Sequence, residues 1–279
     1  MSTEQKLEAE ALFKKAVKYA EMCKPQEEKA VYDSIVEQYG DCVDPELKQV
    51  VVKALMNKGV TQGQMGHLRD ALAVFDEIEQ RIGQEQEPRL QALRAGTLIN
   101  KGVVLGQQGS ADKAAGVYDQ VIAAYANDPS PELQEQVAKA LVNKGAMFSR
   151  RNNVEQVDAV YRETMERFAD NESPRIQQWV ARAIYNRGLC FEKQQKTEEA
   201  ISAYEDIVAR YEASEELELK RQVAGAMFNK AVNLARDGNR DAANVVYDEL
   251  LERFSASEDE VLKGHVDRAK FNRGFSYHF

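Results

Sequence analysis

The sequence repeats itself every 43 residues, and this periodicity limits its possible folds more than any other feature. An aromatic residue recurs at this step, and so does an asparagine that is followed by a basic residue and then a small one. The spacing holds over five periods without insertion or deletion. The aromatic residues are Tyr32, Phe75, Tyr118, Tyr161, Tyr204 and Tyr247, and the asparagines are Asn57, Asn100, Asn143, Asn186, Asn229 and Asn272.

Each period contains a long amphipathic helix pattern followed by a short one. In residues 197–211 the apolar side chains fall at i, i+3, i+4 and i+7, which is the stripe of a helix with one buried face. The long pattern, typified by residues 130–152, begins with a proline at the first helical position. We expect it to end at a left-handed residue, which is Gly66, Gly109, Asn152 or Gly238 in four repeats and Gln195 as the exception.

Two such helices joined by two or three residues form an antiparallel hairpin, which cannot bury its apolar faces alone. Successive hairpins must therefore stack. The sequence predicts an all-α fold, a right-handed α-solenoid of six antiparallel hairpins and a terminal helix, as a single solenoid over residues 1–279. The repeats are expected at about 1–41, 42–84, 85–127, 128–170, 171–213 and 214–256, and the terminal helix at 257–279.

Residues 183–211 resemble a tetratricopeptide repeat, with the family's positions filled by Ile184, Gly188, Phe191, Ala200 and Tyr204. The resemblance extends over essentially the whole chain. Two departures are the period, 43 instead of about 34 residues, and the Lys or Arg that precedes the glycine in place of an apolar residue. Longer-period relatives such as kinesin light chains exist. The resemblance implies peptide or protein binding in a concave groove lined by the first helices, and it identifies no partner.

Helix geometry places the repeated asparagine opposite the small residue that faces the short helix. Residues three and four positions away from it complete one ridge along the groove. The resemblance implies that these asparagines grip a peptide backbone, since an amide both donates and accepts. The alternative is that they bridge to the adjacent hairpin. The candidate peptide-binding residues are Asn57, Asn100, Asn143, Asn186, Asn229, Asn272, Lys139, Arg150, Trp179, Arg182, Lys193 and Arg236.

The charge of this ridge differs from that of the whole chain. With 37 basic and 46 acidic residues the net charge is −9, which argues against nonspecific binding to nucleic acid or to an anionic membrane. No acidic residue interrupts the ridge positions from 50 to 236, and its cations gather in the C-terminal half. This asymmetry favours an acidic or carboxylate-bearing peptide as ligand, with solvated surface charge as the alternative. Trp179 is either a ligand anchor or a cover for a neighbouring helix.

The sequence contains no familiar motif for catalysis, phosphate binding or metal binding. Its cysteines, Cys23, Cys42 and Cys190, form no CxxC pair, which argues against a disulfide framework or a zinc site. We therefore expect no enzyme activity and no cofactor. There is no apolar leader and no apolar run of membrane-spanning length, so we expect a cytoplasmic protein.

The terminal helix ends with an aromatic line, Phe271, Phe275 and Phe279. Terminal repeats usually present a polar outer face, so this line indicates a truncated chain or docking against another molecule, such as a second copy in a homodimer. Three functions remain open. The chain is a scaffold that binds an extended acidic peptide in its groove, a self-assembling structural protein that uses its aromatic end, or a sensor whose curvature changes when a peptide binds.

Overall fold

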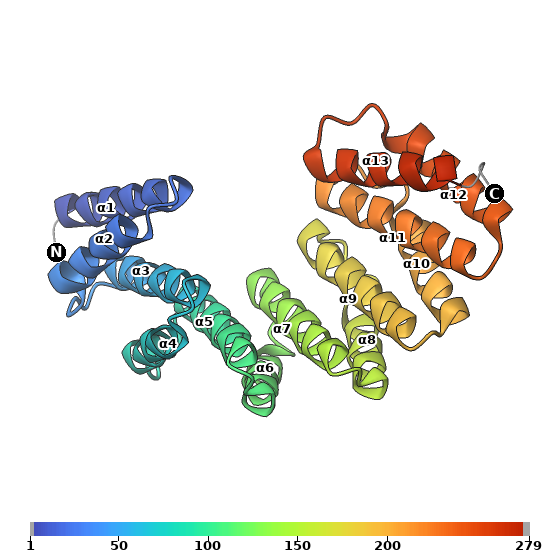
Figure 1. The fold of residues 1–279 in the computed structure, drawn as a ribbon. Helices are drawn as coiled ribbons and strands as arrows, with labels where there is room; N and C mark the ends of the chain where they lie inside the picture. The colour runs from blue at the N-terminus through green and yellow to red at the C-terminus, as the bar shows by residue number, and fades with distance from the viewer. Residues whose placement is uncertain (1–2, 276–279) are drawn as a thin grey trace. The chain divides into compact units, whose positions relative to one another are not determined.

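The computed structural model describes residues 3–275, and within that range the chain is helical without any strand (Figure 1). Long and short helices alternate as the 43-residue pattern predicts. The helices are α1 (Thr3–Glu21), α2 (Pro25–Tyr39), α3 (Pro45–Gln64), α4 (Leu68–Ile82), α5 (Pro88–Gln107), α6 (Ala111–Tyr125), α7 (Pro131–Arg150), α8 (Val154–Phe168), α9 (Pro174–Lys193), α10 (Thr197–Tyr211), α11 (Leu217–Arg236), α12 (Arg240–Phe254) and α13 (Glu260–Phe275).

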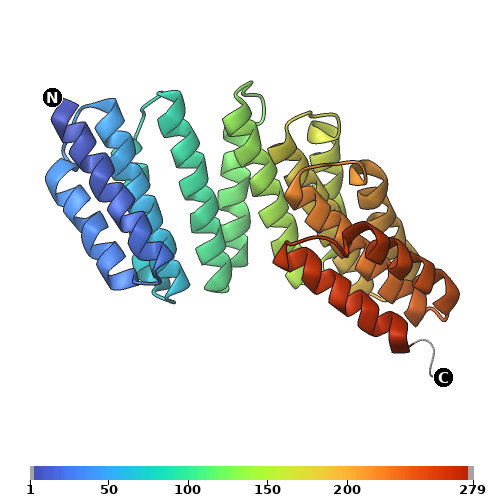
Figure 2. The same ribbon diagram turned by 90° about the horizontal axis from the view of Figure 1, so that it is seen from above.

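The chain divides into two compact units, Met1–Ala140 and Leu141–Phe279. Within each unit a long helix pairs with the following short helix, and that short helix packs against the next long one, as α3, α4 and α5 do in the first unit and α9, α10 and α11 in the second. Figures 1 and 2 show these hairpins stacked in chain order. Hairpin stacking is therefore confirmed inside each unit, and the single solenoid over 1–279 stays a prediction.

The long helices of successive hairpins also contact one another, α1 with α3 and α3 with α5 in the first unit, and α9 with α11 and α11 with α13 in the second. Each unit therefore has a layer of long helices, here called the inner layer, and a layer of short helices. The core lies between them. Five of the six repeated aromatics are buried there, each at most 3% exposed: Tyr32, Phe75, Tyr118, Tyr204 and Tyr247.

Tyr161 is the exception among the six repeated aromatics. It is partly exposed, its hydroxyl donates to Asp206 at 3.3 Å, and its ring lies 4.4 Å from the Arg187 guanidinium. An arginine, Arg162, follows it where the other repeats have an acidic residue, so Arg187 pairs with Asp158 and covers the ring.

The long helices end as predicted, at a residue with positive φ. The angle is +80° at Gly66, +55° at Asn152 and +59° at Gln195, so Gln195 adopts the same conformation although it has a Cβ. Cys23 holds the corresponding position in the first hairpin, at +54°. The His67 N–H donates to the Gln62 carbonyl at 2.9 Å, which completes the hydrogen-bonded turn that ends a helix in this way.

Candidate functional site

The repeated asparagine and the basic residue after it tie each long helix to the preceding hairpin. Asn57 donates to the Tyr32 hydroxyl at 3.1 Å, and Lys58 pairs with Asp33 at 2.5 Å. In both pairs the partner lies 25 residues earlier. The basic residue that departs from the family pattern therefore forms an ion pair between hairpins. The other described pairs of this kind are Lys101–Asp76, Arg187–Asp158, Lys230–Glu205 and Arg273–Asp248.

The small residue that completes the triplet faces the short helix of its own hairpin. A Cβ built on Gly102 would lie 2.5 Å from Cε1 of Tyr118, and one on Gly188 would lie 2.7 Å from Cε1 of Tyr204. Real side chains do not approach that closely, so the buried ring would have to shift to admit a Cβ at this point. The triplet thus sets packing in both directions along the stack.

The six asparagines of the ridge are all partly exposed, and they fall into two groups. Asn57, Asn229 and Asn272 donate to tyrosine hydroxyls, and Asn229 reaches both Tyr185 at 2.9 Å and Tyr204 at 3.4 Å. These three amides bridge to the adjacent hairpin. Asn100, Asn143 and Asn186 make no side-chain hydrogen bond with another residue of the described range. A peptide-binding role for any of them stays a prediction.

The residue 25 positions before each asparagine explains part of this division into two groups. Asn100 has Phe75 at that distance, which offers no hydroxyl. Asn186 has Tyr161, whose hydroxyl donates to Asp206 instead. For Asn100 the signal was therefore present in the sequence, as the phenylalanine 25 positions earlier.

The predicted ridge cations of the second unit lie exposed on the inner layer. Arg182, Lys193 and Arg236 form no ion pair with any carboxylate in residues 3–275. The Lys193 ammonium donates to the Ser149 carbonyl at 3.4 Å, and the Arg182 guanidinium lies 5.7 Å from the ring of Trp179, which is partly exposed. Arg150 is exposed at the end of α7, and Lys139 is partly exposed in the first unit.

Arg268 extends this basic surface onto α13. Its guanidinium lies 4.6 Å from the Phe228 ring, and one of its nitrogens lies 2.8 Å from Nδ1 of His265. Burial, with a contribution from Arg268, lowers the pKa of His265 to about 4, so the ring is neutral at pH 7. Gly225 leaves room for this arrangement, because a Cβ there would lie 3.4 Å from both Tyr185 and His265. Sequence reasoning missed His265, since its repeat equivalents are not histidines.

Sequence reasoning also missed a polar cluster around Glu192. This residue stands where the other repeats have glycine, serine or alanine. Its Oε1 accepts from the Tyr204 hydroxyl at 2.9 Å and from Asn233 at 2.6 Å. Burial and the Glu192 charge both raise the pKa of Tyr204, so its hydroxyl remains a donor. The signal was a charged residue at a position that is otherwise small.

The terminal helix is less apolar on its outer face than its aromatic line indicates. Phe271 is 64% exposed, although its repeat equivalent Ile99 is fully buried. Asp267 and Lys270, however, occupy the repeat positions at which α11 has a buried alanine and a buried methionine. A further short helix packed on α13 would therefore bury both charges. The side chain of Phe275 and all of Phe279 lie outside the described residues. The homodimer through this line stays a prediction.

Other kinds of site find little support. The three cysteines are free, and burial raises the pKa of the Cys42 and Cys190 thiols, which opposes a role as nucleophile. No group of three or more histidine, cysteine or acidic side chains within residues 3–275 is placed to hold a metal ion. None of the described helices combines the length and the apolar character that a membrane crossing requires.

Comparison with known proteins supports the repeat assignment. Residues 182–214 match the tetratricopeptide repeat family model. The crystal structure of BtubC (BKLC) from P. vanneervenii is similar with a TM-score of 0.64 at 19% identity, covering 91% of this chain and 93% of that one. MamA (41–end) from Desulfovibrio magneticus RS-1 gives a TM-score of 0.49 at 17% identity, covering 75% and 97%. No curated protein sequence matches the chain.

At these identities the structural similarity concerns the fold alone. The family model covers the second part of α9, all of α10 and the beginning of the next connection, and the same residue pattern recurs at every 43-residue step. Helix bounds, buried aromatics and hairpin packing follow that step in both units. The chain therefore has a helical-repeat fold with a 43-residue period, and residues 182–214 of it match a tetratricopeptide repeat.

Proposed function

We propose that the inner layer of the second unit binds an extended acidic segment of a partner protein. The observation that carries this proposal is the difference between two sets of cations. The described triplet cations are neutralised by carboxylates 22 to 29 residues earlier, as Lys101 and Arg187 are. Arg182, Lys193 and Arg236 have no such partner among the described residues, in a protein whose net charge is −9.

The affinity of such a site comes from several small contributions. An exposed ion pair contributes about 0.2–1 kcal/mol and is weakened by salt. A hydrogen bond from Asn143 or Asn186 to a peptide backbone would add about 0.5–1.5 kcal/mol. A segment that meets four or five of these groups at once would therefore gain about 2–6 kcal/mol, which corresponds to a dissociation constant of roughly millimolar, and the shared positive charge would speed its association.

Charge reversal tests the proposal. We expect Arg182→Glu combined with Arg236→Glu to weaken binding of the best acidic peptide from an array at least about tenfold in fluorescence polarisation. Arg240→Glu is the matched control, because Arg240 is exposed at the start of a short helix and has no ion pair with a described residue. If all variants bind acidic peptides as the wild type does, the inner layer is not the site.

The asparagines provide a second, independent test. Asn143→Ala and Asn186→Ala remove amides without a described partner, so we expect weaker peptide binding and little change in thermal stability. Asn57→Ala removes an amide that is bonded to Tyr32, so it should lower stability instead. Equal loss of stability in all three variants would mean that the ladder is architectural throughout.

Self-association is the second candidate, because Phe271 is 64% exposed, whereas its repeat equivalents Ile99 and Val142 are buried. Light scattering at high protein concentration distinguishes the two functions. A dimer that Phe271→Ser converts to a monomer would support self-assembly, and a wild-type monomer would remove this candidate.

A further inference from the structure

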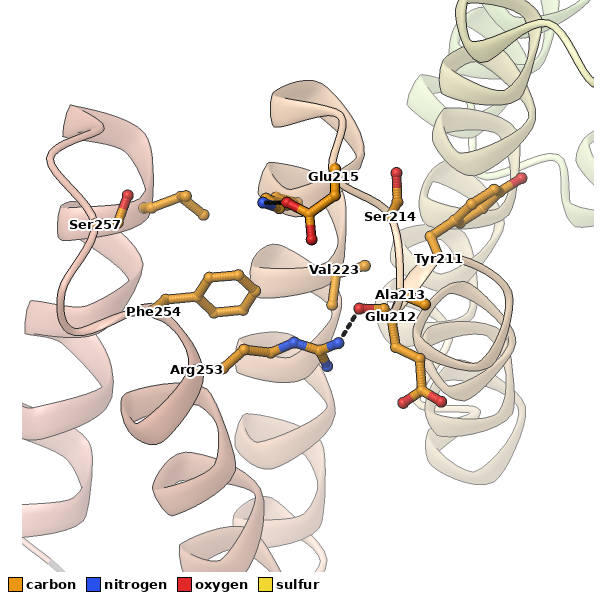
Figure 3. A pocket seen from close by; sticks show the side chains of 11 residues that line it. Tyr211, Glu212, Ala213, Ser214, Glu215, Val223, Arg253, Phe254 and Ser257 are labelled. Atoms are coloured by element: carbon orange, nitrogen blue, oxygen red, sulfur yellow. Dashed lines mark hydrogen bonds and ion pairs between the residues drawn. The ribbon is translucent and has the colours of Figure 1, made fainter.

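A pocket with a volume of about 450 Å³ lies at the loop edge of the second unit, among the connection after α10, the first turns of α11, the end of α12 and the connection to α13 (Figure 3). Its floor is apolar and its rim is polar, which is the usual composition of a small-ligand site. The floor consists of Tyr211, Val223, Phe254 and Leu262, each at most 7% exposed. The rim includes Lys220, Arg253 and the hydroxyls of Ser214 and Ser257.

A lysine lines this pocket at the position where three other hairpins have a glutamine. Gln134 and Gln177 hold that position in their hairpins, and each donates to three carbonyls of the connection before its helix. Their amides thus cap and fill the space beneath the loop. Lys220 instead pairs with Glu215 of its own connection at 2.5 Å. The other hairpin with lysine here, Lys48, also has a pocket, of about 180 Å³.

Arg253 distinguishes the larger pocket from the smaller one. Its repeat equivalents Arg81, Arg167 and Arg210 each pair with a carboxylate four residues earlier. Arg253 makes no ion pair with Glu249 or with any other described carboxylate. It donates to the carbonyl oxygen of Glu212, which fixes its guanidinium at the pocket, while the Glu212 carboxylate points away (Figure 3). A guanidinium has five N–H donors, so one such bond leaves most of them for a ligand.

We propose that this pocket binds a carboxylate carried on a small apolar body, such as an aryl acid. Arg253 would hold the carboxylate with two N–H groups, and the apolar body would lie on Phe254 and Val223. Glu215 is 92% exposed, so its pair with Lys220 is a weak surface interaction that a ligand carboxylate can replace. The acid can be a free metabolite-sized molecule or the last residue of a peptide, since both present the same groups.

The probes are phenylacetate and its neutral isostere phenylacetamide, titrated into the full chain and followed by two-dimensional NMR. We expect phenylacetate to bind at about millimolar concentration, with shifts concentrated on Tyr211, Val223 and Phe254, and the amide to bind about tenfold more weakly. N-acetylphenylalanine and its amide show whether the natural ligand is a free small acid or the last residue of a peptide. Tighter binding of N-acetylphenylalanine than of phenylacetate indicates a peptide terminus, and equal binding indicates a free acid. Equal binding of acid and amide overturns the proposal.

Three variants make the test specific. Arg253→Gln should weaken phenylacetate binding at least about tenfold. Arg81→Gln is the matched control, because Arg81 also donates to the carbonyl of the preceding short helix, that of Gly40 at 2.8 Å, yet lies in the other unit. Lys220→Gln restores the glutamine of the other hairpins and should close the pocket without loss of thermal stability. Binding unchanged by Arg253→Gln, or lost equally in the Arg81→Gln variant, refutes the site. The pocket and the acidic-segment site on the inner layer share no residue, so either can fail alone.

Discussion

Two glycines of α5 receive opposite predictions for the same substitution. A Cβ on Gly102 would lie 2.5 Å from Cε1 and 2.7 Å from Cζ of Tyr118, a ring that is 3% exposed and has no open side. A Cβ on Gly106, one turn later on the same helix, would meet nothing within 4 Å. We therefore expect Gly102→Ala to destabilise the protein and Gly106→Ala to stabilise it.

The size of the difference follows from two opposing effects. Replacing a helical glycine by alanine favours the helix by up to about 1 kcal/mol in both variants. Forcing a methyl group into a filled core costs about 1–3 kcal/mol, and this applies to Gly102 alone. The helix effect cancels in the comparison, so the two variants should differ in free energy of unfolding by about 1–3 kcal/mol.

Urea denaturation followed by circular dichroism measures this difference, and hydrogen exchange in α5 and α6 locates it. One repeat already has an alanine at the equivalent point, Ala231, which is fully buried. Ala231→Gly should therefore destabilise, the reverse of Gly106→Ala. If Gly102→Ala and Gly106→Ala stabilise equally, the Tyr118 ring moves aside at no cost, and the argument that the triplet glycine sets hairpin packing is wrong.

Three further variants test other local features. Gln195→Gly should raise stability by about 0.5–1 kcal/mol in thermal denaturation, because Gln195 has a φ of +59° that glycine adopts with less strain; an unchanged midpoint would contradict this. Asn57→Ala should cost about 1–3 kcal/mol, since it leaves the buried Tyr32 hydroxyl without its donor, whereas Asn100→Ala should cost little. The pKa of His265 is lowered to about 4 from an ordinary 6.5, so its contribution to stability is complete above pH 6.5 and is lost as pH falls toward 4. Wild type should therefore lose up to about 3 kcal/mol more than His265→Gln over that interval, and equal losses would exclude the histidine as the cause.

The fold was predictable because the repeat encodes it redundantly. Proline at the start, a left-handed residue at the end and an apolar stripe between them mark the long helix in most periods, and the observed bounds follow these signals. The first hairpin, which lacks the initial proline on α1 and ends that helix at Cys23, matches because it stacks on the hairpin that follows. Because the same signals recur in successive periods, a signal that is missing from one helix does not change the predicted fold.

The candidate site was predictable in position and only partly in chemistry. The ridge lies partly exposed on the inner layer, as helix geometry predicts. Whether an asparagine on it is available depends on a side chain from a different helix, as the contrast between Tyr32 and Phe75 shows. The partial exposure of Tyr161 has a similar origin, because Arg187 pairs with Asp158 in the one repeat that has an arginine, Arg162, in place of the acidic residue. The sequence pattern of a single helix does not reveal such differences, because they depend on side chains of other helices.

The pocket beside Arg253 was beyond sequence reasoning for a further reason. A change from glutamine to lysine at one repeat position is a common surface exchange, and its effect depends on the loop carbonyls that only glutamine caps. The loss of an ion pair between Arg253 and Glu249 is likewise invisible, because the acidic residue is still present four positions earlier. Both facts concern which of several available partners a side chain selects.

The distance of 25 residues between a bonded asparagine and its tyrosine has a consequence for chain length. Removing residues 214–256, one whole period, would bring Asn272 to the same distance from Tyr204, and Arg273 to the same distance from Glu205. Both new pairs are of the kinds already found in the protein. Recombination between repeats would therefore preserve these two contacts in shorter or longer chains, whereas an insertion of another size between two partners would break their bond. A change in length by whole hairpins would thus keep these contacts between neighbouring hairpins.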